Sequence, residues 1–141
     1  MDFALAMAES LPFPDDTFDC ATIGFALRNV TDVQKTIQEM VRVTKTGGRI
    51  ICLEFSQPSN KLFHSVYRFY LFYILPLIGT LISRKKYAYT YFPRSIAEFL
   101  TLEELEQIME KSGLKDVQTH SLSWGAAVVY IGIKETKGER Q

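Results

Sequence analysis

The sequence has no excess of charge of either sign and little cysteine. Its 141 residues include 16 Lys and Arg and 16 Asp and Glu, so the formal net charge is zero. This balance implies no bulk electrostatic attraction to nucleic acid or anionic lipid, and we predict no nucleic-acid partner. Cys20 and Cys52 both lie in apolar runs typical of strands. We therefore predict two buried, reduced thiols rather than a disulfide, and their spacing supports no metal site.

The chain also lacks the features of targeting and membrane-spanning segments. Its first residues, MDFALAMAES, have no positively charged region of the kind that begins a signal peptide. The uncharged part of its most apolar segment runs only from Phe69 to Ser83 and contains Pro76 and Gly79, whereas a span needs about 20 apolar residues. We expect a cytoplasmic protein. The basic cluster 84–86 suits a membrane surface or, more commonly, a solvated helix end, which leaves peripheral membrane contact open.

The first half of the chain has the pattern of an α/β unit. The short apolar run Cys20–Phe25, bounded by turn residues, predicts a buried strand. Thr31 and Gln34 predict a capping box for the helix that follows, and Gly47 predicts its left-handed C-cap. The next apolar run, Arg49–Phe55, is typical of an interior strand.

The adjacent glycines Gly47 and Gly48 raise the question of a cofactor loop. A phosphate-binding loop runs from a strand into the N-terminus of a helix, where backbone N–H groups favour an anion. These glycines run from a predicted helix into a predicted strand. We therefore interpret them as a helix stop and a tight turn.

The second half predicts helices first and then two strands. Its aromatic segment 62–82 predicts a helix and a broken second segment, which serve as core packing or as an apolar lid. Thr101 and Glu104 form a second capping box, and Gly113 ends that helix. We expect a partly parallel sheet with an antiparallel final strand. The predicted parts are a loop entry (1–18), a strand-helix-strand unit (19–56), an apolar helical insert or lid (57–100), a helix with two strands at 117–124 and 126–134 (101–134), and a disordered tail (135–141).

Several blocks of sequence resemble one enzyme family. LPFPDDTFD, TIGFALRNVTD, RVTKTGGRIICLEFSQP, YTYFPRSI and SWGAAVVYIGIK are similar to the UbiE-type ubiquinone/menaquinone C-methyltransferases, which are class I S-adenosylmethionine-dependent enzymes. The resemblance runs from Ala8 to Lys134. It implies an α/β fold, the C-terminal half of a Rossmann-like class I methyltransferase sheet, with only the last four of seven strands. It also implies that the family's glycine-rich cofactor loop and the acidic residue for the ribose lie outside this sequence.

The resemblance assigns four residues to S-adenosylmethionine. Met7 and Ala8 stand where family members have Asn-Ala or Asp-Ala beside the adenine. The thioether of Met7 replaces a polar group that could pair with the adenine base. The backbone N–H of Ala8 could still contact the base. Gly24 and Phe25, at the end of the first predicted strand, match positions that line the cofactor.

By resemblance, the reaction transfers a methyl group to a ring carbon of a polyprenylated quinol. Such a step needs a deprotonated phenolic oxygen, an aligned sulfonium methyl group and exclusion of water. Arg28 follows a strand at the carboxyl edge, where open α/β sheets bind ligands, so we predict that it is catalytic and stabilises the phenolate. The alternative is a surface ion pair with Asp32 or a contact at the start of the following helix. Asn29 orders the turn or contacts the substrate ring.

Three residues match the family block that closes over the substrate, and we predict that Tyr89, Tyr91 and Ser95 bind it. Pro93 and Arg94 replace residues that are usually aliphatic and acidic, which leaves the lid geometry open. The aromatic segment 63–81 suits either a prenyl tail or the core.

Two functions follow. The chain is part of a quinone C-methyltransferase, or it is a non-catalytic remnant that self-associates or binds lipophilic molecules. In both cases the missing strands would expose the edge of strand 20–25, which we expect to pair with a second copy as a homodimer.

Overall fold

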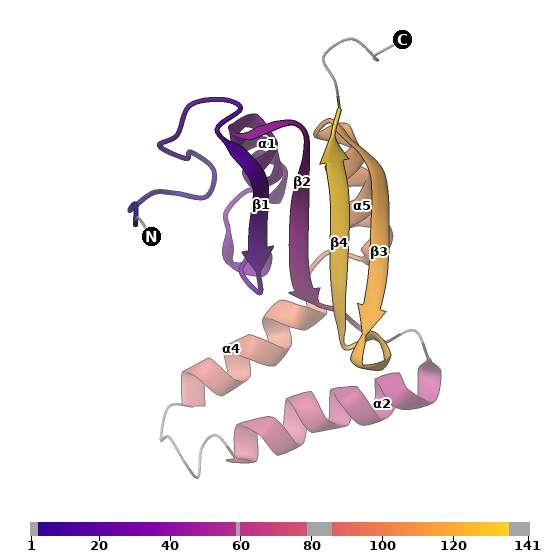
Figure 1. Cartoon of the computed structure of the whole chain (residues 1–141). Coiled ribbons are helices and arrows are strands. Elements are labelled where there is room, and N and C mark those ends of the chain that lie inside the picture. The colour runs from indigo at the N-terminus through magenta and orange to yellow at the C-terminus, as the bar shows by residue number, and fades with distance from the viewer. Residues whose placement is uncertain (1–2, 59, 79–85, 136–141) are drawn as a thin grey trace.

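The computed structural model describes residues 3–58, 60–78 and 86–135 (Figure 1). Short turns of 3-10 helix at Leu27–Asn29 and Ser123–Gly125 separate some of its elements. The elements are β1 (Phe18–Gly24), α1 (Val33–Val43), β2 (Thr44–Phe55), α2 (Lys61–Phe69), a π-helical turn (Tyr70–Ile74), α4 (Lys86–Ala97), α5 (Leu102–Lys111), β3 (Leu114–Leu122) and β4 (Ala127–Lys134).

The four strands form one mixed sheet in the order β1-β2-β4-β3. β1 and β2 are parallel, and β4 runs antiparallel to both β2 and β3. The predicted α/β class and the antiparallel final strand are therefore confirmed. Since β1 and β3 are at the two edges, β1 pairs with only one strand among the described residues.

One face of the sheet packs against α1 and α5 (Figure 1). Alternate side chains of each strand point to this face, as the period of two requires. The core includes Ile37 and Met40 from α1, Ile50 and Cys52 from β2, Leu105 and Met109 from α5, and Val128 and Tyr130 from β4.

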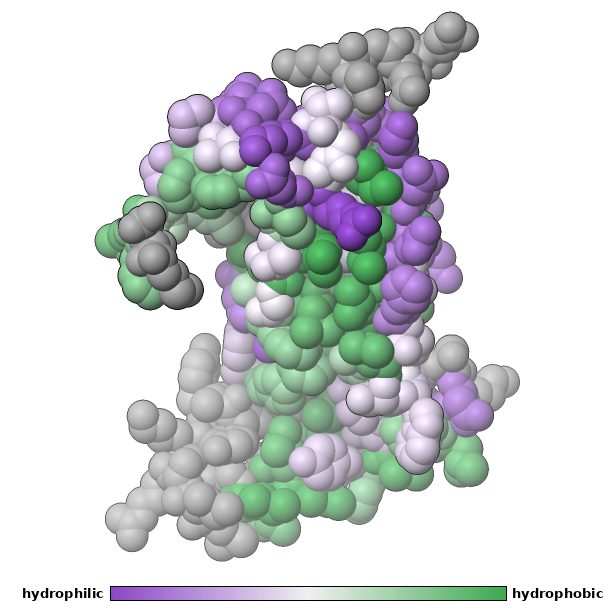
Figure 2. Space-filling model, in the orientation of Figure 1, coloured by the Kyte–Doolittle hydropathy of each residue, from purple (hydrophilic) through white to green (hydrophobic). Residues whose placement is uncertain are grey.

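The opposite face of the sheet has no helix on it within the part of the chain that the structure describes (Figure 1). Its central side chains are apolar and half-buried, and Figure 2 shows them as a green area bordered by more polar residues. They alternate with the core positions and include Ile51, Leu53, Val129 and Ile131.

The start of α1 differs from the prediction. Asp32, not Thr31, is the N-cap: its carboxylate accepts a hydrogen bond from the backbone N–H of Lys35 (2.9 Å). The backbone N–H of Thr31 instead donates to the carboxylate of Glu9, 22 residues earlier (2.8 Å). A tertiary contact therefore replaces the expected local one.

The glycine pair lies in an irregular part of β2 rather than at a helix C-cap. α1 ends at Val43, and Thr44 is already extended. The pairing of β1 with β2 shifts here, because Phe18 faces Thr44 while Cys20 faces Arg49. Gly47 has φ +76°, and a Cβ at Gly48 would lie 2.7 Å from a backbone oxygen of β1. The prediction of a helix C-cap at Gly47 is wrong, because α1 ends at Val43 and the glycine pair lies within β2.

The helical predictions for the second half agree better with the structure. The capping box of Thr101 and Glu104 is present, and Gly113 has φ +94° just beyond α5. The first of the final strands, β3, begins earlier than predicted, and it ends at Leu122 because Trp124 adopts φ +57° in the turn before β4. The predicted apolar insert is helical over 61–78 and 86–97. Of the predicted tail, only Glu135 lies within the described residues.

The two cysteines have different surroundings. Cys52 is buried in the core, as predicted, but Cys20 is exposed, because it alternates along β1 with Ala21 and Ile23, which pack against the core, and so lies on the other face of the sheet. Both are free thiols.

Candidate functional site

The carboxyl ends of β1 and β2 meet at one edge of the sheet because the two strands are parallel. The turn Leu27–Asn29 follows β1 at this edge, and α2 and α4 lie across it (Figure 1). This edge brings together Arg28, Asn29 and Tyr91, three of the residues predicted to form the site.

A buried ion pair joins the two strand ends. Nη1 of Arg28 contacts Oε1 of Glu54, and the two side chains are 9% and 1% exposed. Glu54 also accepts hydrogen bonds from the backbone N–H groups of Arg28 (3.4 Å) and Phe55 (3.0 Å). Nη1 of Arg28 donates a further bond to the carbonyl oxygen of Phe25 (2.8 Å). The pair therefore fixes both the turn after β1 and the end of β2.

Aromatic rings enclose the guanidinium. Its central carbon lies 5.1 Å from the ring centre of Phe55 and 5.5 Å from that of Phe92. Phe25 stacks on Phe55 at 4.4 Å. Nε of Arg28 is buried and has no hydrogen-bond partner among the described residues. Cation–π attraction at a site removed from water holds the guanidinium in place.

This geometry changes the interpretation of Arg28. The surface pair with Asp32 is not formed, because Asp32 caps α1. The partner is Glu54, which sequence reasoning missed. The sequence did contain a signal for this partner, because Glu54 is the only carboxylate in the apolar run RIICLEF. A charged group buried in such a strand needs a partner of opposite charge. A guanidinium already paired with a carboxylate has less charge left for a substrate phenolate, so the structure favours a positioning role.

The predicted substrate residues behave differently from one another. The hydroxyl of Tyr91, in α4, donates to Oδ1 of Asn29 at 3.0 Å, which joins the insert to the turn after β1. Both side chains lie near the surface, where a ligand could reach them. The hydroxyl of Ser95 donates to the carbonyl oxygen of Phe92 (2.9 Å) and so serves α4 itself. Tyr89 is also in α4, but its side chain lies outside the described residues.

Burial and nearby charge shift two pKa values at this edge. Burial, followed by the carboxylate of Glu54, raises the pKa of the Cys52 thiol to about 12. Cys52 is therefore a neutral core residue rather than a nucleophile. The pKa of the Tyr67 hydroxyl is also raised, because the effect of burial exceeds the opposing effect of the Arg28 charge.

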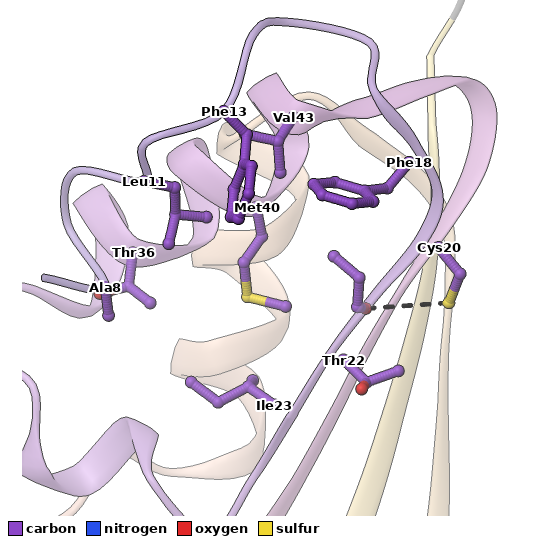
Figure 3. Close-up of a pocket in the computed structure, with 11 residues that line it drawn as sticks. Ala8, Leu11, Phe13, Phe18, Cys20, Thr22, Ile23, Thr36, Met40 and Val43 are labelled. Atoms are coloured by element: carbon purple, nitrogen blue, oxygen red, sulfur yellow. Dashed lines mark hydrogen bonds between the residues drawn. The ribbon is translucent and has the colours of Figure 1, made fainter. Parts of the chain in front are cut away.

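A separate apolar cavity of about 310 Å³ lies between the N-terminal segment, β1 and α1 (Figure 3). Ala8 and Leu11 come from the N-terminal segment, Thr22 and Ile23 from β1, and Met40 from α1. Ala8 is the only one of the four predicted cofactor residues that lines this cavity.

The other three predicted cofactor residues lie elsewhere. Met7 is largely exposed and forms an isolated bridge with Ser10. Gly24 ends β1 beside open space, and Phe25 belongs to the aromatic cluster at the carboxyl edge. In the part of the chain that is described, no three His, Cys, Asp or Glu side chains are grouped so that they could hold a metal ion.

The fold is that of class I S-adenosylmethionine-dependent methyltransferases. An S-adenosylmethionine-dependent methyltransferase from Thermotoga maritima, described as a possible histamine N-methyltransferase, superposes with a TM-score of 0.62 and 24% identity over 92% of this chain and 62% of that one. The YcgJ protein of Bacillus subtilis gives a TM-score of 0.57 and 21% identity, over 93% of this chain and 70% of that one.

The sequence comparison defines the family. The profile of the ubiE/COQ5 methyltransferase family matches residues 1–134, and the chain belongs to this family. Its relatives include the ubiquinone/menaquinone biosynthesis C-methyltransferase UbiE of Geobacter sulfurreducens, at 44% identity over 94% of this chain and 52% of that protein. The demethylmenaquinone methyltransferase of Halalkalibacterium halodurans is 42% identical over 94% of this chain and 54% of that protein. The chain thus spans about half the length of these relatives.

Family and fold imply S-adenosylmethionine as the cofactor, and the described residues fit only part of it. The apolar cavity beside Ala8 suits an adenine ring. The hydroxyl of Thr36 on its wall already donates to the carbonyl oxygen of Asp32, and the carboxylate of neighbouring Glu9 accepts from the backbone N–H of Thr31. Among the described residues that line the cavity, none is an Asp or Glu that could bind the ribose hydroxyls and none is a glycine of a turn for the methionine group.

Proposed function

We propose that this chain is the C-terminal half of an S-adenosylmethionine-dependent C-methyltransferase of quinone biosynthesis, which works in the cytoplasm on a ring carbon of a polyprenylated quinol. The observation that carries the proposal is the 42–44% identity to UbiE and demethylmenaquinone methyltransferase enzymes across 94% of the chain. These relatives do not favour the alternative of a non-catalytic remnant.

The carboxyl edge supplies the residues for substrate binding in this proposal. The cofactor, when bound, supplies an electrophilic methyl group. The Tyr91 hydroxyl and the Asn29 amide offer polar contacts to a quinol hydroxyl, and the aromatic cluster excludes water behind the ring. The pair of Arg28 and Glu54 holds the turn that carries Asn29. Direct stabilisation of the phenolate by Arg28, and contacts from Tyr89 and Ser95, remain predictions.

We further propose that a glycine-rich segment outside these 141 residues holds the methionine part of the cofactor. Gly47 and Gly48, the only adjacent glycines, lie in an irregular part of β2 rather than before a helix N-terminus. On this basis, S-adenosylmethionine binds the isolated chain with a dissociation constant weaker than about 100 µM, or about −5.5 kcal/mol. Calorimetric titration measures this value.

Joining the chain to the N-terminal half of the G. sulfurreducens UbiE tests the function. We expect the joined protein to bind S-adenosylmethionine and to transfer its labelled methyl group to a demethylated quinol. A joined protein that folds, by circular dichroism, and binds the cofactor but methylates no quinol would refute the proposed substrate class.

The role of Arg28 can be tested in the same joined protein. If Arg28 contacts the phenolate, Arg28→Lys retains part of the rate and Arg28→Ala lowers kcat by about a hundredfold with little change in KM. If Arg28 positions the turn, both variants raise KM and also lower the melting temperature, because Lys lacks the planar fork that fits Glu54 and the aromatic rings.

A further inference from the structure

The helix that begins with α2 turns an apolar side toward solvent. Residues at helical spacing along it are exposed, for example Leu62 (77%), Tyr73 (68%) and Leu77 (64%). We call this side the outer α2 stripe. It consists of Leu62, Val66, Phe69, Tyr70, Tyr73 and Leu77.

The inner side of the same helix already makes the contacts that hold it on the protein. Leu71 is buried, and together with Tyr67 it lines a small crevice with Pro93 and Ile96 of α4. A helix on the surface of a soluble protein usually has polar residues opposite such an inner side. Here both sides are apolar, and within the described residues nothing covers the outer one.

The charge of this part of the chain is strongly one-sided. Residues 57–97 contain six Lys and Arg and no Asp or Glu, while the rest of the chain contains ten Lys and Arg and 16 Asp and Glu. The net charge of zero therefore conceals a segment of +6 and a remainder of −6. Arg68 lies on α2 itself, next to the stripe, with its guanidinium 5.7 Å from the ring centre of Phe72.

Aromatic residues at the same end of the molecule are amphipathic. Trp124, in the turn before β4, is 84% exposed, and its ring meets that of Phe63 of α2 edge-on at 5.4 Å. Tyr and Trp are enriched where one end of a side chain is in an apolar medium and the other in water. In Figure 2 the end that carries α2 is largely green where it is described.

We propose that the outer α2 stripe docks this protein on an anionic lipid surface, with α2 lying in the plane of the interface. An interfacial helix combines an apolar face with basic residues, as this one does. The 18 residues 61–78 would extend about 27 Å along the surface. No helix within the described ranges is long and apolar enough to cross a bilayer. The one-sided charge favours lipid with anionic headgroups over neutral lipid.

Vesicle co-sedimentation of the 141-residue chain tests this directly. We expect binding to vesicles of phosphatidylcholine mixed with phosphatidylglycerol, weaker binding in high salt, and little binding to phosphatidylcholine alone. Trp124 is the only tryptophan, so a blue shift of its emission reports docking at this end. Equal binding to both kinds of vesicle, or binding to neither, would overturn the proposal.

Two matched variants localise the contact. Tyr73→Glu places a negative charge in the outer α2 stripe, and we expect it to lower the vesicle partition coefficient by about tenfold. Leu5→Glu makes a similar change at a fully exposed apolar residue of the N-terminal segment and should leave partitioning unchanged. If the two folded variants partition equally, the outer α2 stripe is not the surface that contacts lipid. Methyl transfer is not measured, so this test is independent of the proposed reaction.

Discussion

Removing the charge of Glu54 should destabilise the fold severely, because Arg28 would be left buried without a counter-ion. Glu54 is 1% exposed and accepts hydrogen bonds from Nη1 and the backbone N–H of Arg28 and from the backbone N–H of Phe55. In Glu54→Gln, a neutral amide can keep part of this network but offers no charge. Breaking a buried pair in this way costs about 3–5 kcal/mol.

The loss expected for Glu54→Gln is large compared with the whole free energy of unfolding. A domain of this length has a free energy of unfolding of roughly 7–20 kcal/mol, so Glu54→Gln removes a substantial fraction. The melting temperature should fall by roughly 10–20 °C. Urea unfolding of the 141-residue chain, followed by far-ultraviolet circular dichroism, gives the free energy directly.

The ion pair of Arg94 and Glu98 provides the control. It has the same chemistry, but the side chains of Arg94, in α4, and Glu98, just after α4, are both largely exposed. Glu98→Gln should change the free energy of unfolding by less than about 0.5 kcal/mol. If Glu54→Gln were as mild as Glu98→Gln, the buried pair would not stabilise this edge of the sheet, and the positioning role assigned to Arg28 would be refuted.

Three further predictions concern acid stability, the site and assembly. Hydrogen bonds from Arg42 lower the pKa of Glu39 from 4.5 to about 2. The carboxylate of Glu39 therefore contributes fully to stability above pH 4.5, and this contribution is lost as the pH falls toward 2. The melting temperature of Glu39→Gln should depend less on pH over that range than that of the wild type. Tyr91→Phe removes the hydrogen bond to Asn29 and should change the free energy of unfolding by less than about 1.5 kcal/mol, while raising the quinol KM of the joined protein. The free edge of β1 should make the isolated chain a homodimer at micromolar concentration by light scattering, and Thr22→Lys should weaken the dimer; a wild-type monomer would contradict this.

Elements defined by local signals were predicted well. The second capping box, the glycine after α5 and the apolar strand β2 each depend on residues close in sequence. The antiparallel final strand followed from the order of elements, because β3 and β4 are joined by a short turn. The resemblance to methyltransferases added the fold family, which these local signals could not determine.

Features that depend on pairing between distant segments were missed. Gly24 faces Leu53 in the parallel register of β1 and β2, so the residues that follow each of them come together at one edge. That register brings Arg28 to Glu54, 26 residues away, whereas sequence spacing suggested nearby Asp32. The irregularity at Gly47 likewise depends on the pairing of β2 with β1, and the exposure of Cys20 depends on which face of the sheet the helices cover.

Replacing both members of the buried pair separates its role in folding from its role in function. Arg28→Met combined with Glu54→Leu removes both charges and keeps apolar volume beside Phe55 and Phe92. Because the desolvation penalty of a buried pair often equals its attraction, this double variant should unfold with a free energy close to that of the wild type, unlike Glu54→Gln. If the pair positions the turn for the quinol, the joined protein carrying the double change should remain folded, bind S-adenosylmethionine and lose methyl transfer. Retained transfer would show that the pair serves the fold alone, and the polar contacts of Tyr91 and Asn29 would then have to account for substrate recognition without it.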